Sequence, residues 1–313
     1  MMSELPLDQV RTLLAVVDEG TFDAAANALR LTPSAVSQRV KALEQRTGRV
    51  LLMRTKPVRP TESGEVVVRF ARQLARLERD ARTALGMSGP GEPTPLSIAV
   101  NSDSLATWFL PALRRVPQDL DLAYELHRED QDHMATLLRE GLVMAAVTSS
   151  PEAVTGCSVR RLGRMRYLPV AEPAFADRWL GRRTGADVRE LIEDAPVVSF
   201  DRRDDLQDSF VRRLVPGARA SSRRHLVPSS EGFASAVAAG MGWGMVPDVQ
   251  AEPLLRDGRL VLLVPDRTVD VPLHWQQWKL DSPALATVAE AVAAEAADTL
   301  AGGRPIAPHP LRG

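Results

Sequence analysis

The sequence has little cysteine, few aromatic residues and no long apolar run. Cys157 is the only cysteine among 313 residues, which excludes an intrachain disulfide and suits a reducing compartment. No apolar run reaches the roughly 18 residues of a membrane-spanning helix, so we expect no membrane segment. The first residues carry neither a basic nor an apolar segment of the secretory type, so we expect a cytoplasmic protein.

Net charge is also nearly absent, at −1, but this balance hides a local excess of cations. Residues 27–60 contain one acid, Glu44, and eight basic residues: Arg30, Arg39, Lys41, Arg46, Arg49, Arg54, Lys56 and Arg59. So dense a group of cations points to a polyanion, and double-stranded DNA is the expected partner. A basic face that is merely solvated is the alternative explanation.

The chain is too long for one ordinary core, which favours two domains or a small domain followed by a bilobed one. Three short helical patterns begin it: Leu7–Asp18, Asp23–Arg30 and Pro33–Thr47. Thr32 is a good N-cap for the third helix, Pro33 suits its first position, and Gly48 fits just beyond its end. The order predicts a helix-turn-helix in residues 1–61.

The third helix has a buried and an exposed face. Val36, Val40 and Leu43 recur at the spacing of a core-facing stripe. The opposite face carries short hydrogen-bonding side chains and one cation: Ser34, Ser37, Gln38 and Lys41. Such side chains suit base edges and phosphates in a major groove, and we add Thr32 and Pro33 at the helix start to the predicted DNA contacts.

Two segments, GTFDAAA at 20–26 and LTPSAVSQRVKALE at 31–44, closely resemble the amino-terminal signature of LysR-type transcriptional regulators. The segments VLLMR at 50–54 and RPTESG at 59–64 extend the resemblance. It implies a winged helix-turn-helix, whose wing residues Arg54, Lys56 and Arg59 would hold phosphates or the minor groove. As a transcription regulator, the protein would also be expected to contact RNA polymerase.

Residues 62–87 predict one long helix, with apolar residues at 3-4-3-4-3 spacing: Val67, Phe70, Leu74, Leu77, Ala81 and Ala84. This pattern fits a coiled-coil seam or an ordinary amphipathic helix packed on its own domain. The family resemblance implies a linker helix that forms a homodimer through Phe70, Leu74, Leu77 and Ala81, and dimers that can pair into tetramers. Three prolines and two glycines near residues 88–93 predict a hinge.

Beyond the hinge, apolar runs alternate with helical patterns, which predicts an α/β domain with mainly parallel sheets. The expected strands are Leu96–Val100, Leu120–Leu126, Met144–Thr148, Tyr167–Ala171, Val197–Phe200, Gly244–Val246, Arg259–Leu263 and Val271–Trp275. The expected helices are Ser104–Arg115, Asp132–Glu140, Leu206–Leu214, Ser230–Ala239 and Ser282–Leu300.

The resemblance implies that residues 94–301 form a two-lobed effector domain like periplasmic solute-binding proteins. Lobe I would comprise about 94–165 and 269–301, and lobe II about 166–268. The tail at 302–313 is expected to be flexible.

Ligands of open α/β sheets bind beyond the carboxyl ends of the strands. The loops expected there supply the candidate effector residues: Ser102, Asp103, Ser104, Glu129, Asp130, Thr148, Phe200, Asp201, Ser229, Ser230 and Glu231. Each Ser or Asp could instead cap a helix. Five carboxylates in these loops nevertheless exceed what capping needs, and they favour a cationic ligand.

Residues 100–108, 200–205 and 228–233 resemble the branch of the LysR family that regulates export of lysine and arginine. The resemblance implies a basic amino acid as effector and an amino-acid exporter gene as target. A different effector, such as a neutral amino acid or an organic acid, and an α/β enzyme are the alternatives. We expect no cofactor and no metal, because no residue completes a ligand set with His127 and His133.

Overall fold

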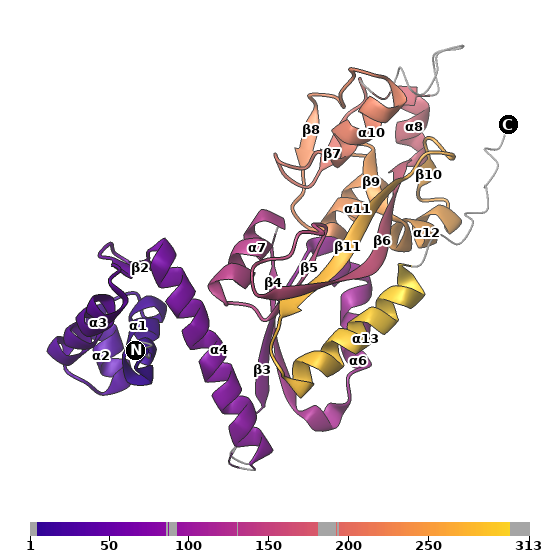
Figure 1. Ribbon diagram of the computed structural model, residues 1–313. Helices are drawn as coiled ribbons and strands as arrows, with labels where there is room; N and C mark the ends of the chain where they lie inside the picture. Colours follow the sequence, from indigo (N-terminus) through magenta and orange to yellow (C-terminus); the bar gives the residue numbers. More distant parts are fainter. Residues whose placement is uncertain are drawn as a thin grey trace.

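The computed structural model describes residues 5–85, 87, 93–129, 131–180, 192 and 194–300 (Figure 1). Asp130, the tail at 302–313 and all of the expected hinge except Pro93 lie outside these residues.

The first unit is a winged helix-turn-helix built from α1 (Leu7–Asp18), α2 (Phe22–Leu29), α3 (Pro33–Thr47), β1 (Leu52–Met53) and β2 (Arg59–Pro60). The Thr32 hydroxyl accepts a hydrogen bond from the Ala35 N–H at 3.2 Å, and Gly48 ends α3 with a left-handed φ of 64°. Val36, Val40 and Leu43 are buried in the core of this unit. The caps and the core-facing stripe expected for α3 are therefore confirmed.

Helix α4 (Glu62–Ala84) leaves the winged helix-turn-helix and runs to the second unit (Figure 1). Its first turns pack on the winged-helix core, where Val67 is 7% exposed. At Val67 the helix therefore packs on its own domain, which is the second of the two alternatives that the apolar pattern left open. Phe70 and Leu77 remain 39% and 42% exposed, and Leu74 is half-buried.

The second unit contains a seven-stranded sheet in the order β10-β6-β11-β5-β3-β4, with β9 also paired to β6. Its strands are β3 (Thr94–Val100), β4 (Leu122–Arg128), β5 (Ala145–Thr148), β6 (Cys157–Ala171), β9 (Gly244–Pro247), β10 (Val261–Leu262) and β11 (Val269–Trp278). Within this sheet, as far as the described residues go, β3 pairs in parallel with β4 and β5, whereas β6 and β11 make antiparallel pairs. The expectation of mainly parallel sheets is wrong, because two long strands cross between the lobes in opposite directions.

Lobe I carries α5 (Ser102–Ser104), the π-helical turn η1 (Leu105–Phe109), α6 (Leu110–Arg114), the 3-10 turn η2 (Gln118–Leu120), α7 (Gln131–Glu140) and α13 (Pro283–Thr299). Lobe II carries α8 (Pro173–Leu180), α10 (Leu206–Leu214), α11 (Ser230–Ala238), α12 (Asp248–Arg256) and the parallel pair β7 (Val197–Ser199) and β8 (Arg224–Leu226). Strands β6 and β11 lie side by side between the two lobes (Figure 1). In their antiparallel register, Arg166 is opposite Asp270.

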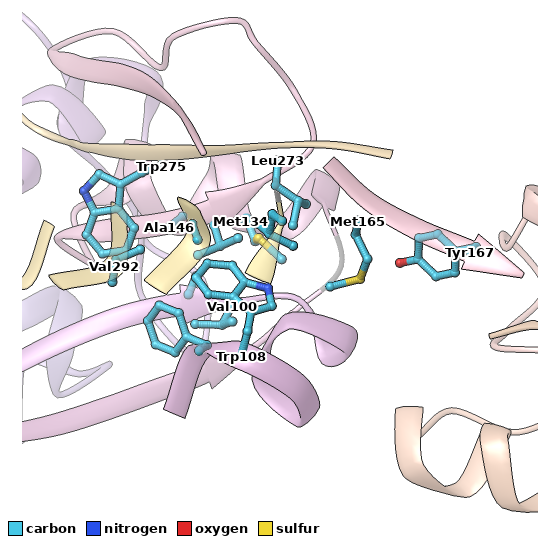
Figure 2. Packing of buried hydrophobic residues seen from close by; sticks show 14 of the residues in the cluster. Val100, Trp108, Met134, Ala146, Met165, Tyr167, Leu273, Trp275 and Val292 are labelled. Carbon is cyan, nitrogen blue, oxygen red and sulfur yellow. The ribbon is translucent and has the colours of Figure 1, made fainter. Parts of the chain in front are cut away.

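The main core fills lobe I and continues along β6 toward lobe II. Trp108 contacts Phe109 edge-on, and Phe109 stacks on Trp275 with the ring centroids 6.5 Å apart. Met165 and Tyr167 extend this cluster along β6 (Figure 2). Tyr167 thus links the core to the region between the lobes, which holds the candidate site.

Candidate functional site

A cavity of about 370 Å³ lies between the two lobes. Lobe I lines it with Ser102 and Asp103, after β3, and with Arg128 and Glu129, at the end of β4. Lobe II lines it with the segments that follow β7 and precede α11. The volume is within the range of small-molecule sites, and the strand ends meet here as expected for an α/β ligand site.

Asp103 lies in the first turn of α5, so it is not the cap of this helix. Asn101 is the N-cap residue, with extended backbone angles, and makes no side-chain capping bond. One carboxylate oxygen of Asp103, Oδ2, accepts a hydrogen bond from the Tyr167 hydroxyl at 2.6 Å. Burial raises the pKa of the Asp103 carboxyl, although hydrogen bonds from Ser230 and Tyr167 act against this rise.

The charges of the cavity wall are unbalanced. Four carboxylates line it, those of Asp103, Glu129, Asp201 and Asp204, against one guanidinium, that of Arg128. The negative charges of Asp204 and Glu231 add to the burial that raises the pKa of Asp103. The wall would therefore gain most from a ligand that carries more positive than negative charge.

Besides the hydrogen bonds to Asp103, further polar contacts join the lobes at this cavity. The Ser230 N–H, at the start of α11, donates to the Ser102 hydroxyl at 3.3 Å. The Arg128 guanidinium donates from Nη1 to the Pro228 carbonyl oxygen at 3.0 Å. The same residues thus line the cavity and hold its two walls together.

Some expected effector residues lie away from the cavity wall. The Thr148 hydroxyl accepts from the Ser150 N–H at 3.1 Å in the turn after β5, and Ser104 is fully buried in α5. The Ser229 hydroxyl caps α11 by accepting from the Gly232 N–H, and it donates to the exposed Glu231 carboxylate. None of these four side chains is part of the cavity lining.

The structure brings the other described candidates together, namely Ser102, Asp103, Glu129, Phe200, Asp201 and Ser230. Asp130 lies outside the described residues.

The expected candidates omitted Tyr167, Asp204 and Arg128. The Asp204 carboxylate accepts from the N–H groups of Phe200 and Leu206 and shapes the lobe II wall. The sequence could have indicated Asp204, because this residue lies in a loop two residues before the expected helix Leu206–Leu214. It held no comparable signal for Tyr167, which lies within a strand.

A second surface lies on α3 and the wing. Ser34, Ser37, Gln38 and Lys41 are exposed along α3, as are Arg54, Lys56 and Arg59 on and around the wing hairpin. The Arg54 guanidinium lies over the Phe22 ring, 5.9 Å from its centroid. The Val58 N–H donates to the Gly20 carbonyl at 2.8 Å, which ties the wing to the turn between α1 and α2.

The two parts of the chain that carry these surfaces match two known sequence families. Residues 7–65 match the bacterial regulatory helix-turn-helix proteins of the LysR family, and residues 90–297 match the LysR substrate binding domain. The chain belongs to the LysR family of transcriptional regulators. It is a DNA-binding regulator with an effector-binding domain, not an enzyme.

Relatives of known name agree with this assignment. The lysine export transcriptional regulatory protein LysG of Corynebacterium glutamicum is 43% identical over 91% of this chain and 95% of its own. The crystal structure of ArgP from Mycobacterium tuberculosis aligns with a TM-score of 0.85 at 45% identity, over 92% of this chain and 96% of the other. Full-length LysG from C. glutamicum with bound effector Arg aligns with a TM-score of 0.81 at 41% identity, over 94% and 99%.

Within the described residues, no helix is both long and apolar enough to span a membrane, and no cluster of three metal-ligating side chains occurs.

Proposed function

We propose that this regulator binds lysine or arginine between the lobes of its effector domain and thereby controls transcription of a gene for a basic amino-acid exporter. The observation that carries the proposal is the cavity wall, with four carboxylates and one guanidinium. Lysine and arginine each carry two cationic groups and one carboxylate. Their net positive charge complements the net negative charge of the wall, and their single carboxylate complements its single guanidinium. Two of the relatives support it by name, one as a lysine export regulator and one with bound Arg.

In the proposed complex, Asp103 meets one cation of the ligand. Its carboxylate is buried enough that its pKa is raised, and it has no cationic partner among the described residues. The second cation meets Glu129 or Asp201 across the cavity. The ligand carboxylate meets Arg128 and the hydroxyls of Ser102 and Ser230 near the start of α11, where the helix dipole favours an anion.

In the proposed DNA complex, the exposed side chains of α3 enter a major groove. Ser34, Ser37 and Gln38 would contact base edges, and Thr32, Pro33 and Lys41 would approach the backbone beside them. Arg54, Lys56 and Arg59 of the wing would neutralise phosphates or enter the minor groove. A cytoplasmic location and contact with RNA polymerase follow from this role.

We further propose a homodimer through α4, with dimers able to pair into tetramers. An apolar stripe on this helix is between 39% and 56% exposed and consists of Val66, Phe70 and Leu77. Leu85, directly after the helix, is 73% exposed. A second copy of α4 would cover this stripe. The domain limits proposed for this arrangement are 1–61 for DNA binding, 62–87 for the linker helix and 94–301 for the effector domain.

Calorimetric titration of the full-length protein tests the effector. Lysine, arginine, norleucine and glutamate are compared, because norleucine keeps the length of the lysine side chain without its cation. Lysine or arginine is expected to bind at least tenfold more tightly than norleucine, about 1.4 kcal/mol. Equal affinity for norleucine would contradict a basic effector, and tighter binding of glutamate would favour an organic acid. Chromatin immunoprecipitation identifies the regulated gene, and a target set without any exporter gene would contradict that part.

A further inference from the structure

Helix α4 carries three arginines on one face, Arg69, Arg72 and Arg76. At 3.6 residues per turn they lie within about 60° of one another around the helix axis, and on average roughly 110° from the exposed apolar side chains of Val66, Phe70 and Leu77. The two faces of α4 can therefore serve two different contacts. The apolar stripe is available to a second subunit, whereas the arginines face the chain's own effector domain.

Each of these arginines donates to a backbone carbonyl oxygen of lobe I. Arg69 Nη1 donates to Thr155 at 3.3 Å, Arg76 Nη1 donates to Pro95 at 2.6 Å, and Arg72 Nη1 donates to Glu140. Pro95 lies at the start of β3, Glu140 ends α7, and Thr155 precedes β6. One helix face thus bonds to three separate segments of lobe I.

Burial distinguishes these bonds from ordinary surface contacts. The Arg76 side chain is 5% exposed and pairs through Nε with Asp80 at 2.9 Å. The Arg72 side chain is 15% exposed. Glu140 supplies a carbonyl at the carboxyl end of α7, where the helix dipole favours a cation. Gly141 follows α7 with a left-handed φ of 74°, and a Cβ atom there would lie 2.8 Å from the Trp278 ring, so the turn beside Arg72 requires glycine.

Arg72 also bonds to the winged helix-turn-helix. Its Nη2 lies 2.6 Å from Asp18 Oδ1, at the end of α1, while its Nη1 holds the Glu140 carbonyl. A single planar guanidinium therefore joins the DNA-binding domain, the linker helix and lobe I. Lysine could not replace it, because one ammonium on a flexible stem lacks this fixed two-armed geometry.

We propose that Arg69, Arg72 and Arg76 form an intrachain clamp that makes lobe I and α4 one rigid body, and that Arg72 is the positioning residue that couples this body to the DNA-binding domain. This rests on the proposed function for its biological consequence. When a ligand changes the angle between the lobes, the clamp conveys that change to α4 and the winged helix. Without it, the effector domain binds its ligand but does not redirect the DNA-binding domain.

The first test measures the clamp without any effector. Spin labels at Asn27→Cys in α2 and Ala286→Cys in α13, in a Cys157→Ser background diluted with unlabelled chain, report the distance between the two domains. Arg72→Gln and Arg72→Lys are expected to broaden the distance distribution at least twofold, whereas Arg79→Gln, an exposed arginine of α4, leaves it unchanged. Equal widths in all four proteins would overturn the clamp.

The second test measures coupling with lysine as the probe. Arg72→Gln and Arg72→Lys are expected to bind lysine within twofold of the parent protein, yet to lose at least threefold of the lysine-induced change in DNA affinity. Retention of the full change would overturn the role of Arg72. If the parent protein itself fails to bind lysine while the Arg72 variants broaden the distances, the clamp stands and the proposed effector is wrong.

Discussion

On α3 and the wing, the side chains assigned to DNA are exposed and project from a small, tightly packed domain. In the effector cavity, Asp103, Asp201 and Asp204 instead accept hydrogen bonds from the protein's own groups. Tyr167 holds Asp103, and the N–H groups of Phe200 and Leu206 hold Asp204. The comparison indicates two forms of recognition, one by exposed charge in water and the other by buried charge that has lost its solvation.

The two surfaces should respond differently to salt and to pH. Contacts with phosphates gain from released counterions and weaken as salt increases. A buried carboxylate is screened far less by salt, but it depends on pH because burial opposes its ionised form. Salt should therefore act mainly on the DNA surface, and pH mainly on the cavity.

The largest expected effect concerns the apolar stripe of α4, through which we propose that two chains pair their DNA-binding domains. Leu77→Glu would place an unpaired charge in the dimer contact and should dissociate the protein. Loss of paired binding should weaken DNA affinity about 100-fold or more. Light scattering and DNA titration measure both effects, with Leu77→Met as the apolar control. An unchanged mass with normal helicity would show that the dimer contact lies elsewhere.

The next effect separates base reading from phosphate binding on the DNA surface. Gln38→Ala should lower discrimination between specific and random DNA by about 1–3 kcal/mol. Arg54→Ala should weaken binding to all sequences and reduce the salt slope by about one unit. Footprinting and salt titrations measure these effects, with the exposed Gln45→Ala of α3 as control. Equal losses of specific and non-specific binding in both variants would contradict this division.

Asp103→Asn tests the cavity directly. Asn keeps the size of the side chain and can still accept from Tyr167, but the charge is removed. Lysine affinity should fall at least tenfold, about 1.4 kcal/mol, with the fold and non-specific DNA binding intact. Calorimetry measures the loss, and the exposed Asp119→Asn of lobe I serves as the control. Unaltered lysine binding would remove Asp103 from the site.

The smallest expected effect is on pH dependence. Because burial raises the pKa of Asp103, its protonation should begin at a higher pH than for an exposed aspartate. Lysine affinity should then weaken as pH falls through this range, and the weakening should be reduced in Asp103→Asn. Calorimetry in buffers of different ionisation enthalpy would detect the accompanying proton release. The same affinity and slope in both proteins would contradict the assignment.

The ligand-free protein should show the opposite sign in stability. Since the folded-state pKa of Asp103 exceeds the unfolded one, the folded state binds more protons between these two values, and stability falls as pH rises through them. Above the folded pKa the cost is fully present. Ligand-free Asp103→Asn should therefore melt at a higher temperature than the parent at neutral pH. A lower melting temperature would indicate that the Asp103 charge stabilises the fold.

Local sequence signals were sufficient for the helices of the helix-turn-helix, whereas the wing was expected only from the family resemblance. The Thr32 cap, Pro33 and Gly48 act within a few residues, and the Val36, Val40 and Leu43 stripe follows from helical periodicity. Helix α10 was also expected with its observed bounds, Leu206–Leu214. Such features depend on neighbours along the chain, so they can be predicted without knowledge of distant contacts.

The sheet and the cavity depend on distant contacts. Alternating apolar runs indicated strands but not their direction, so the antiparallel crossing of β6 and β11 was missed. Loops after strands indicated Ser102, Asp103, Glu129, Phe200, Asp201 and Ser230, because strand ends gather at one edge of a sheet. The same rule also selected Thr148, Ser229 and Glu231, whose orientation depends on local turns and caps.

Tyr167 and the arginines of α4 could not be assigned in advance. Tyr167 lies within a strand and reaches Asp103, 64 residues away, only because the fold brings β6 and α5 together. In the sequence, Arg72 is one of several cations on an amphipathic helix. Only the tertiary structure shows that it contacts Asp18 in one domain and Glu140 in the other. The residue types and their local order thus specify the helices, the caps and the charge of each surface. Which charges lose their water, and which meet a partner, is set by the long-range packing that brings distant segments together.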